Sequence, residues 1–134
     1  MILPPAAGQT LQALLDPESG QPLYIKGKAA IPLLNLPGRS SIEIQAYTYL
    51  EAAKSLLHCQ DPLTEFTLIA VGKDDKGNHH IRLQQQYQGI PIYGAMLSLH
   101  TRNGEVAMLT GRSYPTPTLR NLDPSLSEEI GRVV

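Results

Sequence analysis

The sequence predicts a single α+β domain, in which one main helix packs on an antiparallel meander sheet of about four strands. Two periodicities predict it: apolar residues recur at helical spacing over residues 41–58, and apolar and polar residues then alternate along most of residues 64–113. The 11 glycines and 11 prolines argue against an all-helical bundle. Hydrophobic residues make up 42% of the 134 positions, which is enough to build a core.

The helix is expected over residues 41–58. Ser40, followed by Glu43 three residues later, forms a capping-box pattern at its start. Pro62 prevents the helix from continuing, because proline has no backbone N–H to donate. The apolar face of this helix comprises Ala46, Tyr49, Leu50, Ala53, Leu56 and Leu57.

The sheet is expected to follow as a meander. A polar turn at residues 74–78 separates the first two strands, and a bend at 89–91 separates the second from the third. Asn103-Gly104 is typical of a hairpin turn with positive φ. The four strands are predicted at residues 64–72, 79–88, 92–101 and 105–113.

These predicted elements divide the chain into three parts. Residues 1–39 form an irregular arm, with a short helical turn at 10–15 and a short strand at 23–27, because prolines interrupt it repeatedly. Residues 40–117 form the main domain. Residues 118–134 form a linker and the start of a helix, where Ser125 and Glu128 repeat the capping-box spacing. The abrupt end suggests a piece of a longer precursor, and no export signal is visible in this chain.

Composition excludes several classes of function. The formal net charge of −1 is too small for a strong electrostatic attraction to nucleic acid or anionic lipid. No apolar run approaches the roughly 18 residues of a membrane span. Cys59 is the only cysteine, which rules out an internal disulfide and a multi-cysteine zinc site.

The sequence shows no catalytic constellation: H-E-x-x-H, G-x-S-x-G and phosphate-binding glycine loops are absent. His79 and His80 are adjacent, so on a strand they point to opposite faces and do not easily bind one ion. Residues 74–77 fit a plain turn better than a calcium loop. Cys59 follows a helix end, where carbonyl oxygens raise a thiol pKa, so we expect a packed thiol. We therefore expect no catalytic, cofactor or metal site.

One segment carries a motif that is specific enough to indicate a protein family. Residues 80–95 resemble the core motif of the fungalysin/thermolysin propeptide (FTP) domain, which runs approximately R-x-x-Q-x-Y-x-G-[IL]-P-[VI]-x-G. Residues 97–111 resemble the stretch that follows this motif in the family. Residues 20–27 are similar to an early segment of thermolysin-type proregions. Residues 125–130 are placed like the first helix of a PepSY module. The motif positions are Arg82, Gln85, Tyr87, Gly89, Ile90, Pro91 and Gly94.

Each motif residue has a structural interpretation. Gly89 and Gly94 are expected to permit backbone angles or close approaches that a Cβ would prevent. Pro91 should lie at an edge or a bulge. Arg82 and Gln85 should lie on opposite faces of one strand. We expect Arg82 to pair with a carboxylate or carbonyl across the sheet, and Gln85 to find buried partners, for which the 89–94 turn is a candidate.

The resemblance implies a fold of the cystatin-like kind and a role. It indicates the non-catalytic proregion of a secreted zinc metallopeptidase, which assists folding of the peptidase and inhibits it by binding its surface. The partner would be the cognate metallopeptidase domain in cis, and zinc would belong only to that absent domain. The location would be secreted, cell-surface or periplasmic. The alternative is a standalone secreted or surface binding domain that serves no peptidase.

Overall fold

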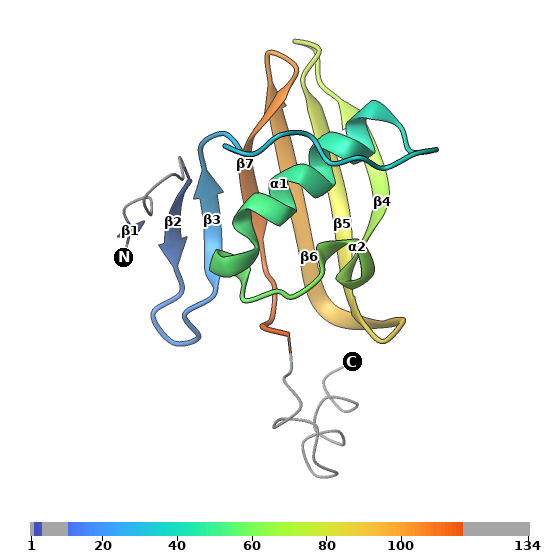
Figure 1. The fold of residues 1–134 in the computed structure, drawn as a ribbon. Coiled ribbons are helices and arrows are strands. Elements are labelled where there is room, and N and C mark those ends of the chain that lie inside the picture. Colours follow the sequence, from blue (N-terminus) through green and yellow to red (C-terminus); the bar gives the residue numbers. More distant parts are fainter. Residues whose placement is uncertain (1, 4–10, 117–134) are drawn as a thin grey trace.

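The computed structural model describes residues 2–3 and 11–116 of the chain. Within these residues, seven strands form one antiparallel sheet in the order β1-β2-β3-β7-β6-β5-β4, together with two helices (Figure 1). The elements are β1 (Ile2–Leu3), β2 (Gln12–Leu15), β3 (Pro22–Lys26), α1 (Ser41–Leu57), α2 (Pro62–Glu65), β4 (Phe66–Lys73), β5 (His79–Tyr87), β6 (Ile90–Arg102) and β7 (Glu105–Gly111).

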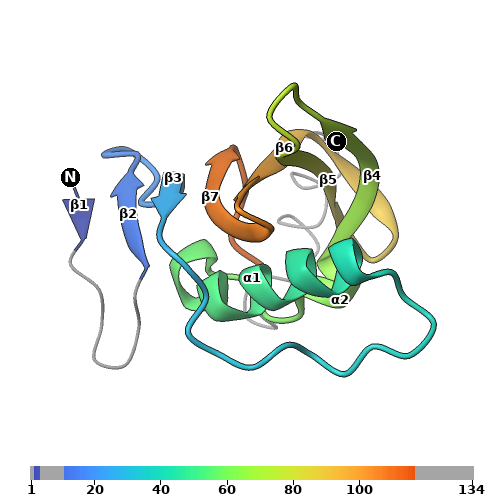
Figure 2. The same ribbon diagram turned by 90° about the horizontal axis from the view of Figure 1, so that it is seen from above.

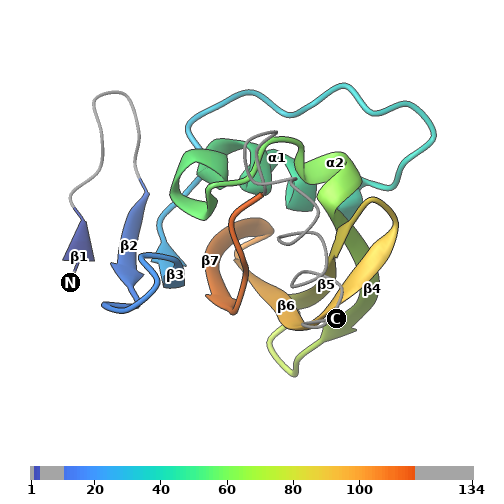
Figure 3. The same cartoon turned by 90° about the horizontal axis from the view of Figure 1, so that it is seen from below.

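The sheet curves around α1, which lies against its concave side with α2 beside it (Figure 2). The connection from β3 to α1 runs along the outer side of α1, as the view from below also shows (Figure 3). The core lies between the helix and the sheet. Its fully buried large apolar side chains are Ile25, Tyr49, Leu50, Leu57, Phe66, Ile81, Leu83, Leu97, Leu99 and Leu109.

Helix α1 confirms the predicted main helix and ends one residue earlier than expected. The Ser40 hydroxyl accepts a hydrogen bond from the Glu43 backbone N–H (3.3 Å) and donates to the Glu43 carboxylate (3.4 Å), so the capping pair forms. His58 ends the helix in the left-handed conformation, with φ at 55°. Asp61 then caps α2, which has Pro62 in its first turn.

The predicted meander is confirmed as β4 to β7, but Thr64 and Glu65, which were expected in its first strand, lie in α2. The turn at Asn103 (φ 55°) and Gly104 (φ 83°) joins β6 to β7 with two residues, as expected. A second two-residue turn, Gln88 (φ 51°) and Gly89 (φ 81°), joins β5 to β6. The bend therefore begins at Gln88 rather than at Gly89.

The prediction of about four strands was too low for the N-terminal region. Strand β3 matches the predicted strand at 23–27 and pairs with β7, while β2 pairs with β3. The helical turn expected at 10–15 is wrong for its described residues. Leu11 and Ala13 are buried whereas Leu14 is exposed, because pairing with β3 imposes the two-residue alternation of a strand. Residues 12–15 and 22–26 are thus strands of the sheet and not parts of an irregular arm.

Some predictions lie outside the described residues: the linker at 118–134, and the capping pair Ser125 and Glu128. The boundaries at 39/40 and 117/118, and the cystatin-like assignment, stay predictions. Neither helix of the described residues combines the length and apolar character needed to cross a membrane.

Candidate functional site

The sheet has two different faces. The face toward α1 is called the covered face here, and the opposite one the open face. Residues alternate between them along each strand, so that Ile81 and Leu83 face α1 while His80, Arg82 and Gln84 lie on the open face. Both described helices pack on the covered side (Figure 2). Register places these side chains on the open face: Tyr24, Lys26, His80, Arg82, Gln84, Met96, Ser98, His100, Met108 and Thr110.

A depression of about 830 Å³ extends from the open face to the turns between β4 and β5 and between β6 and β7. Its lining includes His80 and His100. Four basic side chains and two carboxylates also line it: Lys26, Lys28, Lys76, Arg102, Asp74 and Asp75.

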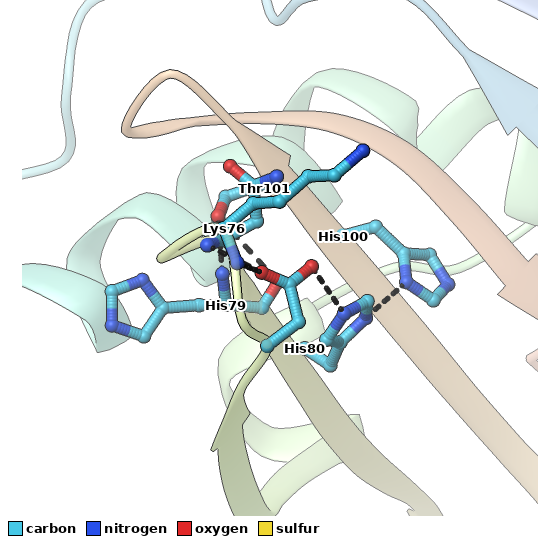
Figure 4. Close-up of polar contacts among 7 residues, drawn as sticks. Lys76, His79, His80, His100 and Thr101 are labelled. Atoms are coloured by element: carbon cyan, nitrogen blue, oxygen red, sulfur yellow. Dashed lines mark hydrogen bonds and ion pairs between the residues drawn. The ribbon is translucent and has the colours of Figure 1, made fainter.

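Two imidazoles meet across the strands at this depression. Nδ1 of His80 lies 2.7 Å from Nδ1 of His100, and the rings pack edge to face with centroids 4.9 Å apart. On the far side of each ring, His80 Nε2 lies 3.3 Å from Asp74 Oδ2, and His100 Nε2 lies 3.1 Å from the Thr110 hydroxyl. Figure 4 shows the His80 ring next to the His100 ring, while the His79 side chain points away. The Asp74 carboxylate contacts the other side of the His80 ring.

The hydrogen-bond network assigns the protons of this chain of groups. Hydrogen bonds from the backbone N–H groups of Asn78 and Lys76, and from His80, lower the pKa of Asp74. Asp74 is therefore a carboxylate, which can only accept, so His80 carries its proton on Nε2. When His80 is neutral, its Nδ1 accepts from Nδ1–H of His100. Burial, and secondarily the nearby His80, lower the pKa of His100.

The sequence prediction that His79 and His80 point to opposite faces is confirmed, but it did not find His100 as the partner of His80. Among the described residues, no group of three or more His, Cys, Asp or Glu side chains is placed to hold a metal ion. The pair instead joins β5 and β6 through a hydrogen bond between the two rings.

Gln85, a motif residue, is the main polar exception on the covered face. Its side chain is 2% exposed. Its amide nitrogen donates to the Tyr114 carbonyl (2.7 Å), and its amide oxygen accepts from the Tyr114 N–H (2.8 Å). The expectation of buried partners is confirmed, but those partners lie in the chain after β7 and not in the 89–94 turn. Gln84 donates instead to the first part of β6, at the carbonyls of Ile92 (2.9 Å) and Ala95 (3.0 Å).

Arg82 lies on the open face, opposite to Gln85 as predicted, but its expected partner is wrong. Its guanidinium donates to Sδ of Met96 (3.1 Å) and not to a carboxylate or carbonyl. The positions across from Arg82 hold Ala70 on β4 and Ser98 on β6, so neither neighbour offers an acidic group.

The remaining motif residues shape the β5–β6 hairpin. Gly89 and Gly94 both have positive φ, at 81° and 78°, as their predicted backbone role requires. Pro91 pairs with Gln86 beside a register irregularity, which fits a bulge; β6 is an interior strand, so the edge alternative is wrong. Tyr87 is half-buried, and Ile90 at the hairpin end is exposed.

Cys59 and Glu65 form a second polar cluster beyond α1. Burial and the neighbouring Glu65 raise the pKa of the Cys59 thiol, which donates to the Glu65 carboxylate (3.4 Å). The thiol is packed, as predicted, although Glu65 and burial are the causes rather than the helix end. Glu65 also accepts from the Thr116 hydroxyl, and the Thr116 N–H donates to the His58 carbonyl (2.8 Å). A raised pKa does not suit a nucleophile.

Comparison with protein families decides the nature of the β4–β7 region. Residues 64–113 match the family model described as Fungalysin/Thermolysin Propeptide Motif. This segment is an FTP motif. It contains the four-strand meander, the Gln85 side chain and the histidine pair.

Relatives of the chain agree with the FTP assignment. The chain is 34% identical over 88 residues to a thermolysin from Alicyclobacillus acidocaldarius subsp. acidocaldarius and to one from Bacillus caldolyticus, covering 65% of this chain and 16% of each relative. It is 30% identical over 95 residues to the thermostable neutral protease NprT from Geobacillus stearothermophilus, covering 70% of this chain and 16% of that protein. No solved structure matched the chain.

Proposed function

We propose that this chain is the propeptide module of a secreted thermolysin-like metallopeptidase and acts on its cognate peptidase domain in cis, as an intramolecular chaperone and as an inhibitor. The observation that carries the proposal is the FTP motif at residues 64–113, within a chain similar to thermolysins. The chain spans 16% of those proteins, which leaves most of their length for other domains.

The open face supports this role physically. Inhibition by occupying a surface needs an exposed interface and no catalytic groups. The open face offers strands that no described helix covers, with polar, aromatic and thioether side chains side by side. We propose that the interface comprises this face and the chain beyond residue 117. The module is non-catalytic, and the zinc of the peptidase reaction belongs to the peptidase domain.

Titration calorimetry of the chain in trans against the matching mature peptidase, with inhibition measured in parallel, tests the proposal. We expect roughly micromolar affinity, since the fragment supplies a partial interface. Ser98→Arg places a long charged side chain in the middle of the open face and should weaken binding at least tenfold. Ser55→Arg makes the same change at an exposed position of α1 and should leave binding unchanged.

The outcomes separate the two candidate roles. Absence of heat and of inhibition at high concentration, with the fragment shown to be folded by circular dichroism, would favour the standalone secreted or surface binding domain. Equal binding by the Ser98→Arg and Ser55→Arg variants would remove the open face from the interface while leaving the propeptide role intact. A downstream H-E-x-x-H helix in the same gene would support the peptidase partner.

A further inference from the structure

We propose that His80 and His100 form a binding site for a late first-row transition-metal ion, with Cu²⁺ as the preferred ion, through their two facing Nδ1 atoms. This site goes beyond the propeptide role and does not depend on it. It also departs from the expectation that the chain holds no metal site. That expectation weighed the adjacent pair His79 and His80, whereas the structure pairs His80 with His100 from the next strand.

The distance between the two nitrogens suits such an ion. Metal–imidazole bonds of roughly 2.0–2.1 Å place two nitrogens about 2.9 Å apart at a right angle, and about 3.3 Å apart at a tetrahedral angle. The observed Nδ1–Nδ1 distance is 2.7 Å. The right-angled arrangement, typical of tetragonal Cu²⁺, therefore requires the smaller increase in this distance, and both rings must turn so that their Nδ1 lone pairs converge on the ion.

The outer hydrogen bonds orient both rings for a metal. Asp74 accepts from Nε2 of His80, the carboxylate–histidine arrangement that commonly supports metal-bound imidazoles. His100 can shift its proton from Nδ1 to Nε2 and donate it to the Thr110 hydroxyl, 3.1 Å away. Both Nδ1 lone pairs are then free, and a neutral pair binds the ion without losing a proton. Protonated imidazoles compete with the metal, so binding weakens at acidic pH.

The surroundings allow an ion to enter but limit its affinity. The His80 side chain is 44% exposed, and the pair opens onto the depression, where water can fill the remaining coordination positions. Four basic side chains line the same depression and oppose a cation. With two protein ligands, we expect the ion to bind reversibly and to be lost on dialysis.

Copper titration of the untagged 134-residue chain, carrying Cys59→Ser to remove the thiol, is the test. Calorimetry should show one site per chain, with affinity in the order Cu²⁺ above Ni²⁺ and Zn²⁺. Electron paramagnetic resonance should show coupling to two nitrogens. His80→Gln and His100→Gln should each weaken Cu²⁺ binding at least tenfold. His79→Gln is the matched control and should not change it, and Asp74→Asn should weaken it about tenfold.

A second measurement needs no substitution at the pair. The chain has four histidines, and trace Cu²⁺ should broaden the NMR ring signals of His80 and His100 before those of His58 and His79. Uniform broadening of all four would overturn the proposal. An equal loss of affinity in the His79→Gln and His80→Gln variants, or no binding at all, would overturn it as well.

Discussion

The two faces of the β5–β6 pair differ although the same two strands build both. On the covered face, Ile81, Leu83, Leu97 and Leu99 are 0% exposed. On the open face, the other residues of the same strands are half-buried or exposed, and their side chains carry imidazoles, a guanidinium, an amide, a thioether and a hydroxyl. Packing against α1 therefore determines the residues of the covered face, while the open face is free to carry binding chemistry.

Truncation of a core leucine should give the largest difference between the faces. Leu99→Ala removes a fully buried side chain and should lower the free energy of unfolding by about 2–5 kcal/mol. Ser98→Ala, one residue away on the open face, should change it by less than about 0.5 kcal/mol. Urea unfolding followed by circular dichroism measures both. Similar unfolding midpoints for the two variants would break the comparison.

Gln85→Leu tests the polar exception on the covered face. It removes both hydrogen bonds to the Tyr114 backbone and leaves those groups without the Gln85 partner, at a cost of about 1–3 kcal/mol. Amide hydrogen exchange at Tyr114 should also become faster. Gln86→Leu is the matched control, since its amide makes an exposed bond to the Thr64 carbonyl, and it should have the smaller effect. Unchanged exchange at Tyr114 in the Gln85→Leu variant would contradict this role.

Gly94→Val should destabilise the fold more than Ser98→Val, although Gly94 is exposed. Its φ of 78° is unfavourable for a side chain by about 1–2 kcal/mol, and β-branching adds to the strain. The position is otherwise open, because a Cβ there would meet no atom within 4 Å. Equal urea-unfolding midpoints for the two variants would show that the exposure of a position alone decides whether it tolerates a valine side chain.

The smallest expected effect is the pH dependence of the open face. The pKa of His100 is lowered in the fold, so on acidification the unfolded chain takes up that proton first, near the ordinary pKa of about 6.5. The His100 contribution to stability is therefore present above about pH 6.5 and is lost as the pH falls through the lower folded pKa. Thermal unfolding should show a smaller loss between pH 7.5 and 5 for His100→Gln than for wild type. His79→Gln should follow wild type; equal slopes in all three would refute the assignment.

The elements predicted best are those whose signals are local. The Ser40–Glu43 cap and the Asn103–Gly104 turn depend on a few neighbouring residues, and both form as expected. Strand β2 was missed because a pairing partner, β3, determines its conformation and not its own sequence. The partner of Arg82 was wrong for a similar reason: the cross-strand neighbours were not visible in the sequence.

The histidine pair shows why the candidate site could not be predicted. A uniform hairpin continued from Tyr87 opposite Ile90 would place His80 opposite Leu97. Between Gln86↔Pro91 and Gln84↔Met96, β5 advances by two residues and β6 by five, so the register shifts and brings His100 opposite His80. Gly94 lies within these additional residues of β6 and was the available sequence signal for the register shift. A glycine indicates that the strand is irregular there, but it does not give the number of additional residues.

The anchoring of residues 114–116 has a mechanical consequence. Beyond β7, Tyr114 is held by Gln85, and Thr116 is held by His58 and Glu65, which together tie this segment to β5, to the end of α1 and to α2. A pulling force applied beyond residue 116 therefore reaches these bonds before it reaches the β6–β7 ladder. Tension from a tethered domain would thus be shared between helix and sheet, and the first rupture would leave the meander intact.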